Sequence, residues 1–218
     1  MTDSNKFRFH EIEQIPERPG VYAWYYNHEI SDLDIKSCQE KLKNSSEDEK
    51  LEIVSEFLKK NIFDYYTEQP YQASIAGELK AKYEGKIFHT PQISQSLIKR
   101  ISEEPDRLCK LKSILQKCVP NFSSPLYIGV AKNLRKRLLN HKEKILKLAN
   151  TEPDSLNSED EDEDNRIAHS FALEVCRDRK FQQSNLYVYV IECSLDDKIR
   201  YDIENLLNRI NYPLCGRK

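Results

Sequence analysis

The segment from Pro125 to His141 constrains the fold more than any other part of the chain. It begins with a short apolar run, Leu126 to Val130, whose composition is that of a β-strand and which contains a glycine at position 129. A strongly basic segment with helical spacing follows, from Lys132 to about Leu148. Because a glycine in a strand lets another backbone or a ligand approach closely, we expect a site where this strand leads into the basic helix.

Arg137 and His141 lie four residues apart in the predicted helix. At that spacing, two side chains share one face of a helix and lie one turn apart. The pair therefore offers a permanent cation beside a titratable imidazole, close to the end of a strand. Phosphate chemistry needs groups of both kinds, so the segment indicates a site for a phosphate-containing ligand.

Two more strands are predicted elsewhere in the chain. Val21 to Tyr26 is rich in aromatic residues and follows a turn at Arg18-Pro19-Gly20. Leu186 to Cys193 is rich in β-branched and aromatic residues and gives the clearest strand pattern of the sequence. Together with residues 126–130 they predict a small three-stranded antiparallel sheet flanked by helices, in an α+β fold.

A final helix, which carries Glu204, is predicted after the third strand. Its apolar residues recur at helical spacing, and we expect them to form its buried stripe: Ile199, Ile203, Leu206, Leu207 and Ile210. Glu204 lies at the flank of this stripe. A carboxylate at that position can border a cleft, although a single glutamate on a helix normally faces solvent.

Residues 28–124, which we call the insertion, separate the first strand from the strand at 126–130. Helical patterns cover residues 48–60, 94–101 and 107–118, and alternation over residues 71–87 predicts a strand or hairpin. Several tyrosines and lysines of the insertion could contact nucleic acid. An ordinary solvated surface explains them equally well, so the function of the insertion stays open.

The charge distribution is more informative than the net charge of −2, which gives no general case for nucleic-acid binding. Seven basic residues and one acidic residue lie between Lys132 and Lys147, whereas residues 159–164 are all acidic. Such an acidic run is usually solvated and disordered. The alternatives are that the acidic run binds a metal ion or that it forms a flap over a basic groove.

Six cysteines, at positions 38, 109, 118, 176, 193 and 215, form no C-x-x-C pair and no cluster with zinc-ligand spacing. We expect free, mostly buried thiols in a reducing compartment. The sequence has no apolar run near the roughly 18 residues that a membrane span needs, and no signal peptide. These features predict a cytoplasmic protein with no membrane partner.

Three short motifs occur in an order that resembles the GIY-YIG nuclease superfamily. They are Gly20-Val21-Tyr22, then Tyr127-Ile128-Gly129 followed by Arg137 and His141, and finally Glu204 on a helix with a proline nine residues later. The resemblance covers about 60 to 70 residues. Because the two halves of the signature usually lie close together in sequence, it implies that residues 28–124 are a large α+β insertion into one domain that spans residues 1–218. It does not reach the insertion itself. It implies a GIY-YIG-like domain that acts as a metal-dependent endonuclease on DNA phosphodiester bonds.

The resemblance also implies roles for five residues. Tyr22 would act as the general base or position the attacking water, with Tyr127 beside it, and neighbouring cations would have to lower the pKa of this phenol. Arg137 would hold the scissile phosphate. His141 would form a hydrogen bond to the water, the tyrosine or a phosphate. Glu204 would bind one Mg²⁺ or Mn²⁺ ion, with water and phosphate oxygens as the other ligands.

Lys132, Arg135 and Lys136, at the start of the basic helix, are the predicted contacts to the DNA backbone. One departure from the family concerns Gly216, which stands where the family often has an asparagine. The departure favours an alternative function, a nucleic-acid-binding module of the same fold with impaired catalysis. A third possibility is a protein-interaction domain whose basic helix meets an acidic partner.

Overall fold

The computed structural model describes most of the chain, namely residues 5–28, 30–67, 70–78, 80–88, 92–150, 163–194 and 196–216. The chain divides into two compact units. The first unit combines Met1–His28 with Gln116–Lys218, and the second comprises Glu29–Leu115. The predicted insertion, residues 28–124, therefore overlaps the second unit over its whole length.

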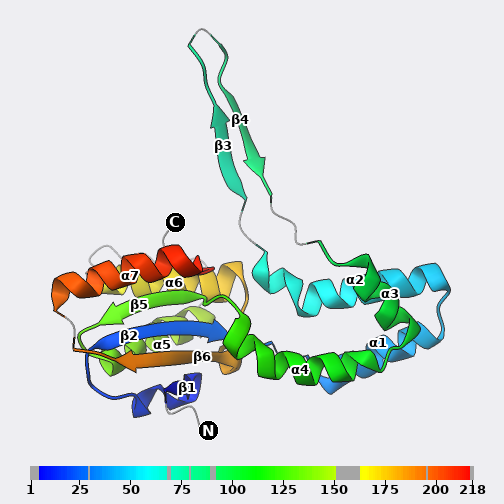
Figure 1. Cartoon of the computed structure of the whole chain (residues 1–218), viewed down its shortest axis with the longest axis horizontal. Helices are drawn as coiled ribbons and strands as arrows, with labels where there is room; N and C mark the ends of the chain where they lie inside the picture. The colour runs from blue at the N-terminus through cyan, green and yellow to red at the C-terminus, as the bar shows by residue number, and fades with distance from the viewer. Residues whose placement is uncertain are drawn as a thin grey trace. The chain divides into compact units, whose positions relative to one another are not determined.

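An antiparallel sheet forms the centre of the first unit (Figure 1). Its strands, in spatial order, are β1 (Lys6–Arg8), β6 (Leu186–Glu192), β2 (Gly20–Tyr26) and β5 (Tyr127–Ala131). The three predicted strands are present, and the prediction of a three-stranded sheet is corrected to four strands. β1 was missed because three residues show no periodicity, and because its pairing of Lys6 with Tyr189 joins distant parts of the sequence.

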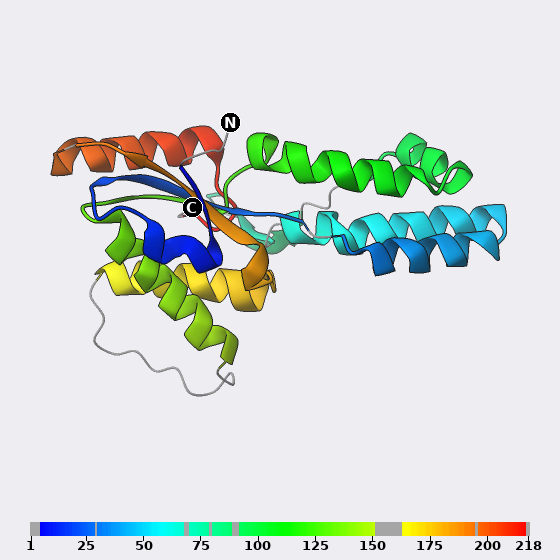
Figure 2. The ribbon, with the colours of Figure 1, turned by 90° about the horizontal axis from the view of Figure 1, so that it is seen from below.

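The alternation of β2 decides which side chains reach the site. Tyr22, Trp24 and Tyr26 are buried on one face, while the residues between them are half-buried on the other. Helices α5 (Leu134–Asn150) and α6 (Glu163–Leu173) cover the first face, and α7 (Asp197–Asn211) lies on the opposite face (Figure 2). Short turns complete the unit: η1 (Phe9–Gln14), the π-helical turn η3 (Glu174–Asp178) and η4 (Gln183–Asn185).

Helix α5 begins after Asn133, whose Oδ1 accepts a hydrogen bond from Lys136 N at 2.9 Å and so caps the helix. Its buried residues recur at helical spacing: Leu134, Arg137, Leu138, His141, Ile145 and Leu148. Arg137 and His141 therefore lie within the core-facing stripe of α5. Their burial follows from their positions in the repeat.

Helix α7 is capped by Asp196, whose Oδ1 accepts a hydrogen bond from Ile199 N at 2.9 Å. The predicted buried stripe is wrong for three of its five residues, because Ile199, Leu206 and Ile210 are 45%, 55% and 72% exposed. Arg200, by contrast, is buried. The side of α7 that meets the sheet thus carries polar residues, and the most apolar side faces solvent.

The segment after α7 returns to the beginning of β5. Leu214 N donates to Pro125 O at 3.1 Å, and Cys215 N donates to Leu126 O at 2.6 Å. Arg179 Nη2 donates to Leu214 O at 3.1 Å. These bonds fix the end of α7 against the motif strand and thereby help to place Glu204.

The second unit is mostly helical. Its elements are α1 (Asp32–Lys43), α2 (Glu47–Asn61), η2 (Phe63–Tyr66), β3 (Tyr71–Ile75), β4 (Tyr83–Ile87), α3 (Gln95–Glu103) and the first part of α4 (Arg107–Phe122). The three predicted helices and the predicted hairpin are confirmed. Apolar residues from all four helices form its core, among them Ile35, Leu42, Val54, Leu58, Ile101 and Leu108.

The β3–β4 hairpin has one apolar face. The cross-strand pairs Tyr71–Ile87, Ala73–Gly85 and Ile75–Tyr83 lie on that face, and polar or charged residues alternate with them on the other. Four of these side chains are exposed to between 48% and 73%. The small Ala73–Gly85 pair leaves open space between the two bulky pairs, since no atom lies within 4 Å of a Cβ built on Gly85.

Three sequence predictions concern the chain as a whole. All six cysteines are free, as predicted, but the prediction that they are mostly buried is wrong: Cys38 and Cys215 are buried, three are half-buried and Cys109 is exposed. Within the described residues, no helix is long and apolar enough to cross a membrane. Of the acidic run, residues 159–162 lie outside the described residues, and residues 163–164 form the start of α6.

Candidate active site

Four of the five predicted catalytic residues meet around the hydroxyl group of Tyr22. Arg137 Nε donates to Tyr22 Oη at 3.2 Å, and His141 Nε2 lies 3.2 Å from the same oxygen. The Tyr127 ring stacks beside the Tyr22 ring, with centroids 6.1 Å apart. Tyr22 is 1% exposed, His141 is fully buried and Arg137 is 9% exposed. The site thus lies within the layer between the sheet and α5.

Gly129 makes this arrangement possible. It is the cross-strand partner of Tyr22, and the Tyr22 ring lies directly over it. A Cβ atom at position 129 would lie 2.5 Å from Tyr22 Oη, 2.6 Å from Tyr22 Cζ and 2.9 Å from Tyr127 Cε1. The glycine is therefore required by the close approach of an aromatic ring to the strand.

An aromatic shell holds the imidazole of His141 in place. Phe171 from α6 lies 5.3 Å from the His141 ring, 5.2 Å from the Tyr127 ring and 5.8 Å from the Trp24 ring, measured between centroids. Packing on several sides fixes the rings, because a close-packed interior leaves little room for rotation. Phe171 was not among the predicted site residues, although it lies in a segment with a helical pattern.

Burial sets the direction of both pKa shifts at the site. Removal from water raises the pKa of Tyr22 well above its ordinary value; Tyr127 and Glu204 raise it further, and Arg137 opposes them. The expectation that Arg137 brings this pKa down is correct for its own contribution and wrong for the net shift. Burial, reinforced by the positive charge of Arg137, lowers the pKa of His141 well below its ordinary value. His141 is therefore neutral at pH 7.

The tautomer of His141 follows from its surroundings. His141 Nδ1 is buried and has no hydrogen-bond partner among the described residues. A buried N–H without an acceptor is rarer in proteins than an acceptor without a donor, so we assign the proton to Nε2. In this tautomer Tyr22 Oη accepts hydrogen bonds from both Arg137 Nε and His141 Nε2. The phenol proton is then the one left to donate elsewhere.

Glu204 belongs to a polar row on the side of α7 that meets the sheet. Arg200, Glu204 and Asn208 follow one another at four-residue spacing and so lie on one side of the helix. The negative charge of Glu204 is the smallest of the causes that shift the pKa of Tyr22, and it raises that pKa. Asn208 Nδ2 donates to Glu204 O at 2.8 Å, while the Oδ1 atom of Asn208 is buried and has no hydrogen-bond partner among the described residues. Sequence reasoning missed Arg200, although its spacing from Glu204 was a usable signal.

Gly216 closes a turn that has no room for the asparagine that the GIY-YIG resemblance would place there. Gly216 N donates to Pro213 O at 3.1 Å. A Cβ atom at position 216 would lie 2.5 Å from Pro213 Cγ. Any other residue would therefore displace the turn that brings Leu214 and Cys215 beside β5, so the lack of an asparagine at this position has a local steric reason.

The three predicted DNA contacts lie in different surroundings. Lys132 is exposed in the turn before α5, and Lys136 is exposed on its first turn. Arg135 is engaged within the protein: its Nε donates to Ile15 O at 2.6 Å, and its Nη1 pairs with Glu17 at 2.7 Å. Arg135 thus links the segment after η1 to α5 and points away from the candidate site.

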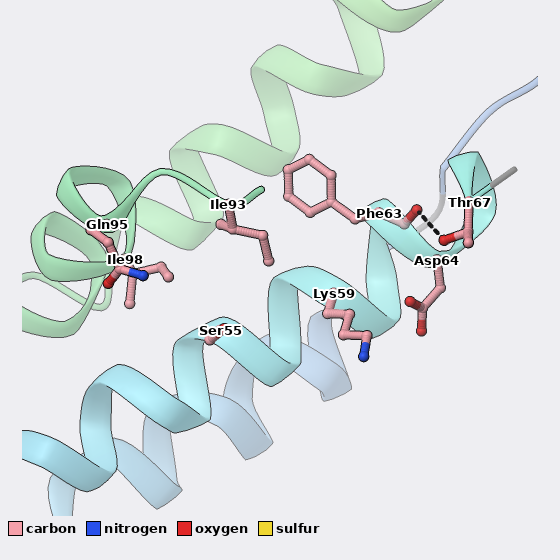
Figure 3. A pocket seen from close by; sticks show the side chains of 8 residues that line it. All are labelled: Ser55, Lys59, Phe63, Asp64, Thr67, Ile93, Gln95 and Ile98. Atoms are coloured by element: carbon pink, nitrogen blue, oxygen red, sulfur yellow. Dashed lines mark hydrogen bonds between the residues drawn. The ribbon is translucent and has the colours of Figure 1, made fainter. Parts of the chain in front are cut away.

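A hollow of about 230 Å³ lies in the second unit (Figure 3). Its lining comes from α2, η2, the first turn of α3 and the residues next to η2 and α3: Ser55, Lys59, Phe63, Asp64, Thr67, Ile93, Gln95 and Ile98. The side chains include one cation and one carboxylate, and none belongs to the three motifs. We therefore place the candidate site at Tyr22 and assign no function to the hollow.

Comparison of the chain with models of protein families, with curated proteins and with solved structures found no significant match.

The buried imidazoles predict a loss of stability in mild acid. Burial lowers the pKa of His28 to about 4 and that of His141 well below its ordinary value, whereas both titrate normally in the unfolded chain. Below about pH 6.5 the unfolded state therefore binds more protons, and the free energy of unfolding falls by up to about 1.4 kcal/mol per pH unit for each imidazole. Above pH 7 both imidazoles are neutral in the folded and in the unfolded state, so they no longer make the free energy of unfolding depend on pH.

Urea unfolding at pH 7.5, 6.5 and 5.5 would measure this effect. The fluorescence of Trp24 is a suitable probe, because it is the single tryptophan and is fully buried in the first unit. His141→Gln should reduce the slope below pH 6.5, and His28→Gln should reduce it independently. An unchanged slope in both variants would contradict the assigned directions.

Proposed function

We propose that this protein is a metal-dependent endonuclease that hydrolyses DNA phosphodiester bonds. The observation that carries the proposal is the Tyr22 hydroxyl, held between Arg137 and His141 over the glycine of the YIG motif. Motif residues more than a hundred positions apart in the sequence surround one oxygen atom. The proposed substrate, DNA, follows from the motif resemblance. The proposed compartment, the cytoplasm, follows from the cysteine pattern and from the sequence prediction of no membrane span and no signal peptide.

In the proposed reaction Tyr22 loses its phenol proton to solvent when the substrate is bound. Its phenolate oxygen then positions a water molecule and takes a proton from it as that water attacks the phosphorus atom. The bond from phosphorus to the leaving sugar oxygen breaks, and the leaving oxygen takes a proton from solvent. The N–H groups of Arg137 and His141 would stabilise the phenolate that forms, because both point at the oxygen that becomes negative. The guanidinium nitrogens of Arg137 beyond Nε suit phosphate oxygens, which accumulate charge in the transition state. The raised pKa of Tyr22 means that substrate binding must offset the effect of burial before the proton moves.

Glu204 and Asn208 are the residues that would hold the metal ion. They offer a carboxylate and an amide oxygen one helical turn apart, and the amide oxygen has no other partner among the described residues. Hard oxygen ligands of this kind suit Mg²⁺, which usually keeps several waters and shares phosphate oxygens with the substrate. When bound, the ion would supply charge stabilisation at the phosphate. Neutralising Glu204 would also remove one of the causes that raise the pKa of Tyr22.

Nicking of supercoiled plasmid in Mg²⁺ or Mn²⁺ tests the proposal. Wild-type protein should nick the plasmid, and Arg137→Ala and Glu204→Ala should each lower the rate at least tenfold. Glu143→Ala is the matched control, because it removes an exposed carboxylate from α5 that has no part in the site. Its rate should equal that of the wild type. Cleavage that persists in Arg137→Ala would contradict the assigned role of the arginine.

The second candidate function is a nucleic-acid-binding module of the same fold without turnover. It is favoured by the burial of Tyr22, whose hydroxyl is shielded from solvent and whose pKa is raised. Such a module would bind duplex, branched or single-stranded DNA with a steep dependence on salt. It would cleave none of them with either metal, whereas the endonuclease would cleave at least one.

A further inference from the structure

Helix α7 exposes an apolar seam that the structure of a single chain leaves without a partner. The seam consists of Ile199, Ile203, Leu206 and Ile210, which follow one another at intervals of four, three and four residues. Ile199, Leu206 and Ile210 are 45%, 55% and 72% exposed, and Ile203 is half-buried at the edge of the sheet contact. The four residues form one continuous stripe along three turns of the helix.

The spacing of the α7 seam is that of a helix–helix interface. Intervals of four and three residues place side chains at the positions where one helix of a coiled coil meets another. Single exposed leucines and isoleucines are common on protein surfaces, but a continuous apolar stripe of this length marks an interaction site. The seam therefore fits another helix better than it fits a flat or charged surface.

The charges beside the seam indicate which helix that is. Asp202 and Arg209 lie seven residues apart along the same edge of the seam, and both are exposed. Arg209 Nε donates to Asn205 Oδ1 at 2.8 Å, which holds the guanidinium along this edge. When two copies of one helix pack antiparallel, each edge of the seam meets the same edge of the other copy in reverse order. Asp202 of one copy then faces Arg209 of the other, and this occurs twice.

We propose that the α7 seam is the interface through which two copies of this chain associate, with their α7 helices antiparallel. A parallel arrangement would instead bring Asp202 toward Leu207, on the opposite edge of the seam, and leave it without a cation there. The self-matching order of the two charges is what a two-fold interface requires, since each surface must complement itself. Binding of an unrelated partner would not require Asp202 and Arg209 to complement one another in this way.

The size of the seam sets the strength of the association. One helix per copy gives an interface below about 1,200 Å², which is the range of weak and transient complexes. We therefore expect a reversible equilibrium between monomer and dimer, with a dissociation constant in the micromolar range. Glu204 lies on a different side of α7, so the association leaves the candidate site uncovered. The proposal does not depend on the nuclease function.

Sedimentation equilibrium of the full chain over a series of concentrations tests the proposal. The wild type should dimerise, whereas Leu206→Asp should stay monomeric at every concentration, because the new carboxylate would be buried in the interface. Leu33→Asp is the matched control: Leu33 is 77% exposed, lies on α1 of the second unit and should not affect the equilibrium. Circular dichroism and the urea midpoint would verify that both variants remain folded.

Charge reversal tests the antiparallel order. Asp202→Arg and Arg209→Asp should each raise the dissociation constant about tenfold, since each places like charges opposite one another. The double variant restores both pairs and should return the dissociation constant to within about threefold of the wild type. A wild type that is monomeric throughout, a dimer that tolerates Leu206→Asp, or a double variant without recovery would each overturn the proposal. The last result would point to a parallel or heterologous partner.

Discussion

Replacing Tyr22 by phenylalanine is expected to slow metal-dependent DNA cleavage by about 10²–10⁴-fold. The substitution removes one oxygen atom and keeps the ring that packs over Gly129 and stacks on Tyr127. Arg137 Nε and His141 Nε2 lose their shared acceptor, and the proposed reaction loses the group that takes the proton from water. The rate of plasmid nicking at saturating protein measures the effect.

Tyr25→Phe is the matched control for this prediction. Tyr25 lies on the same strand but on the opposite face, where it stacks on Tyr187 with ring centroids 5.4 Å apart. Loss of the same atom there should change the nicking rate by no more than about twofold. Equal losses in the two variants would mean that tyrosine hydroxyls matter only to the stability of the sheet. Unchanged cleavage by Tyr22→Phe would remove Tyr22 from the mechanism.

The elements that carry the site were predictable because their patterns are local. The aromatic alternation of residues 20–26, the apolar run around Gly129 and the β-branched segment at 186–192 each identify a strand by composition. The four-residue spacing of Arg137 and His141 placed both on one side of α5. The convergence of these residues on Tyr22 required the order of the strands, which the motif resemblance supplied.

The errors arose where long-range packing decides the outcome. Periodicity finds the apolar stripe of α7, and hydrophobicity then places that stripe inside; the structure buries Arg200 and exposes Leu206 instead. A local pattern identifies the apolar side of a helix. It does not show whether that side contacts the sheet of the same chain or a second molecule. The expected lowering of the Tyr22 pKa was wrong for a related reason. Burial raises this pKa by more than the nearby Arg137 lowers it, and the sequence does not show how deeply a side chain is buried.

Replacing Gly129 by alanine is expected to damage both the fold of the first unit and the candidate site. The added methyl group would lie within 3 Å of the Tyr22 and Tyr127 rings, which are held by the aromatic shell and cannot move aside freely. Overpacking of this kind costs about 1–3 kcal/mol in the free energy of unfolding. Urea unfolding followed by the fluorescence of Trp24 would measure it. Displacement of the Tyr22 hydroxyl by about 1 Å should also slow cleavage about 100-fold.

Gly85→Ala separates this steric effect from the general effect of removing a glycine from a strand. Gly85 lies in β4, and its built Cβ meets no atom within 4 Å, so alanine should fit without strain. Because alanine is favoured over glycine inside a strand by about 0.5–1 kcal/mol, the substitution should be neutral or slightly stabilising. Because Gly85 belongs to the second unit and Trp24 to the first, unfolding is followed both by far-UV circular dichroism, which reports on the helices of both units, and by Trp24 fluorescence. Neither urea midpoint should fall below its wild-type value. A similar loss in both variants would contradict the steric argument, because the strain would then come from the backbone. A loss confined to Gly129→Ala would establish that the YIG glycine makes room for the tyrosine of the opposite strand, whether or not the protein cleaves DNA.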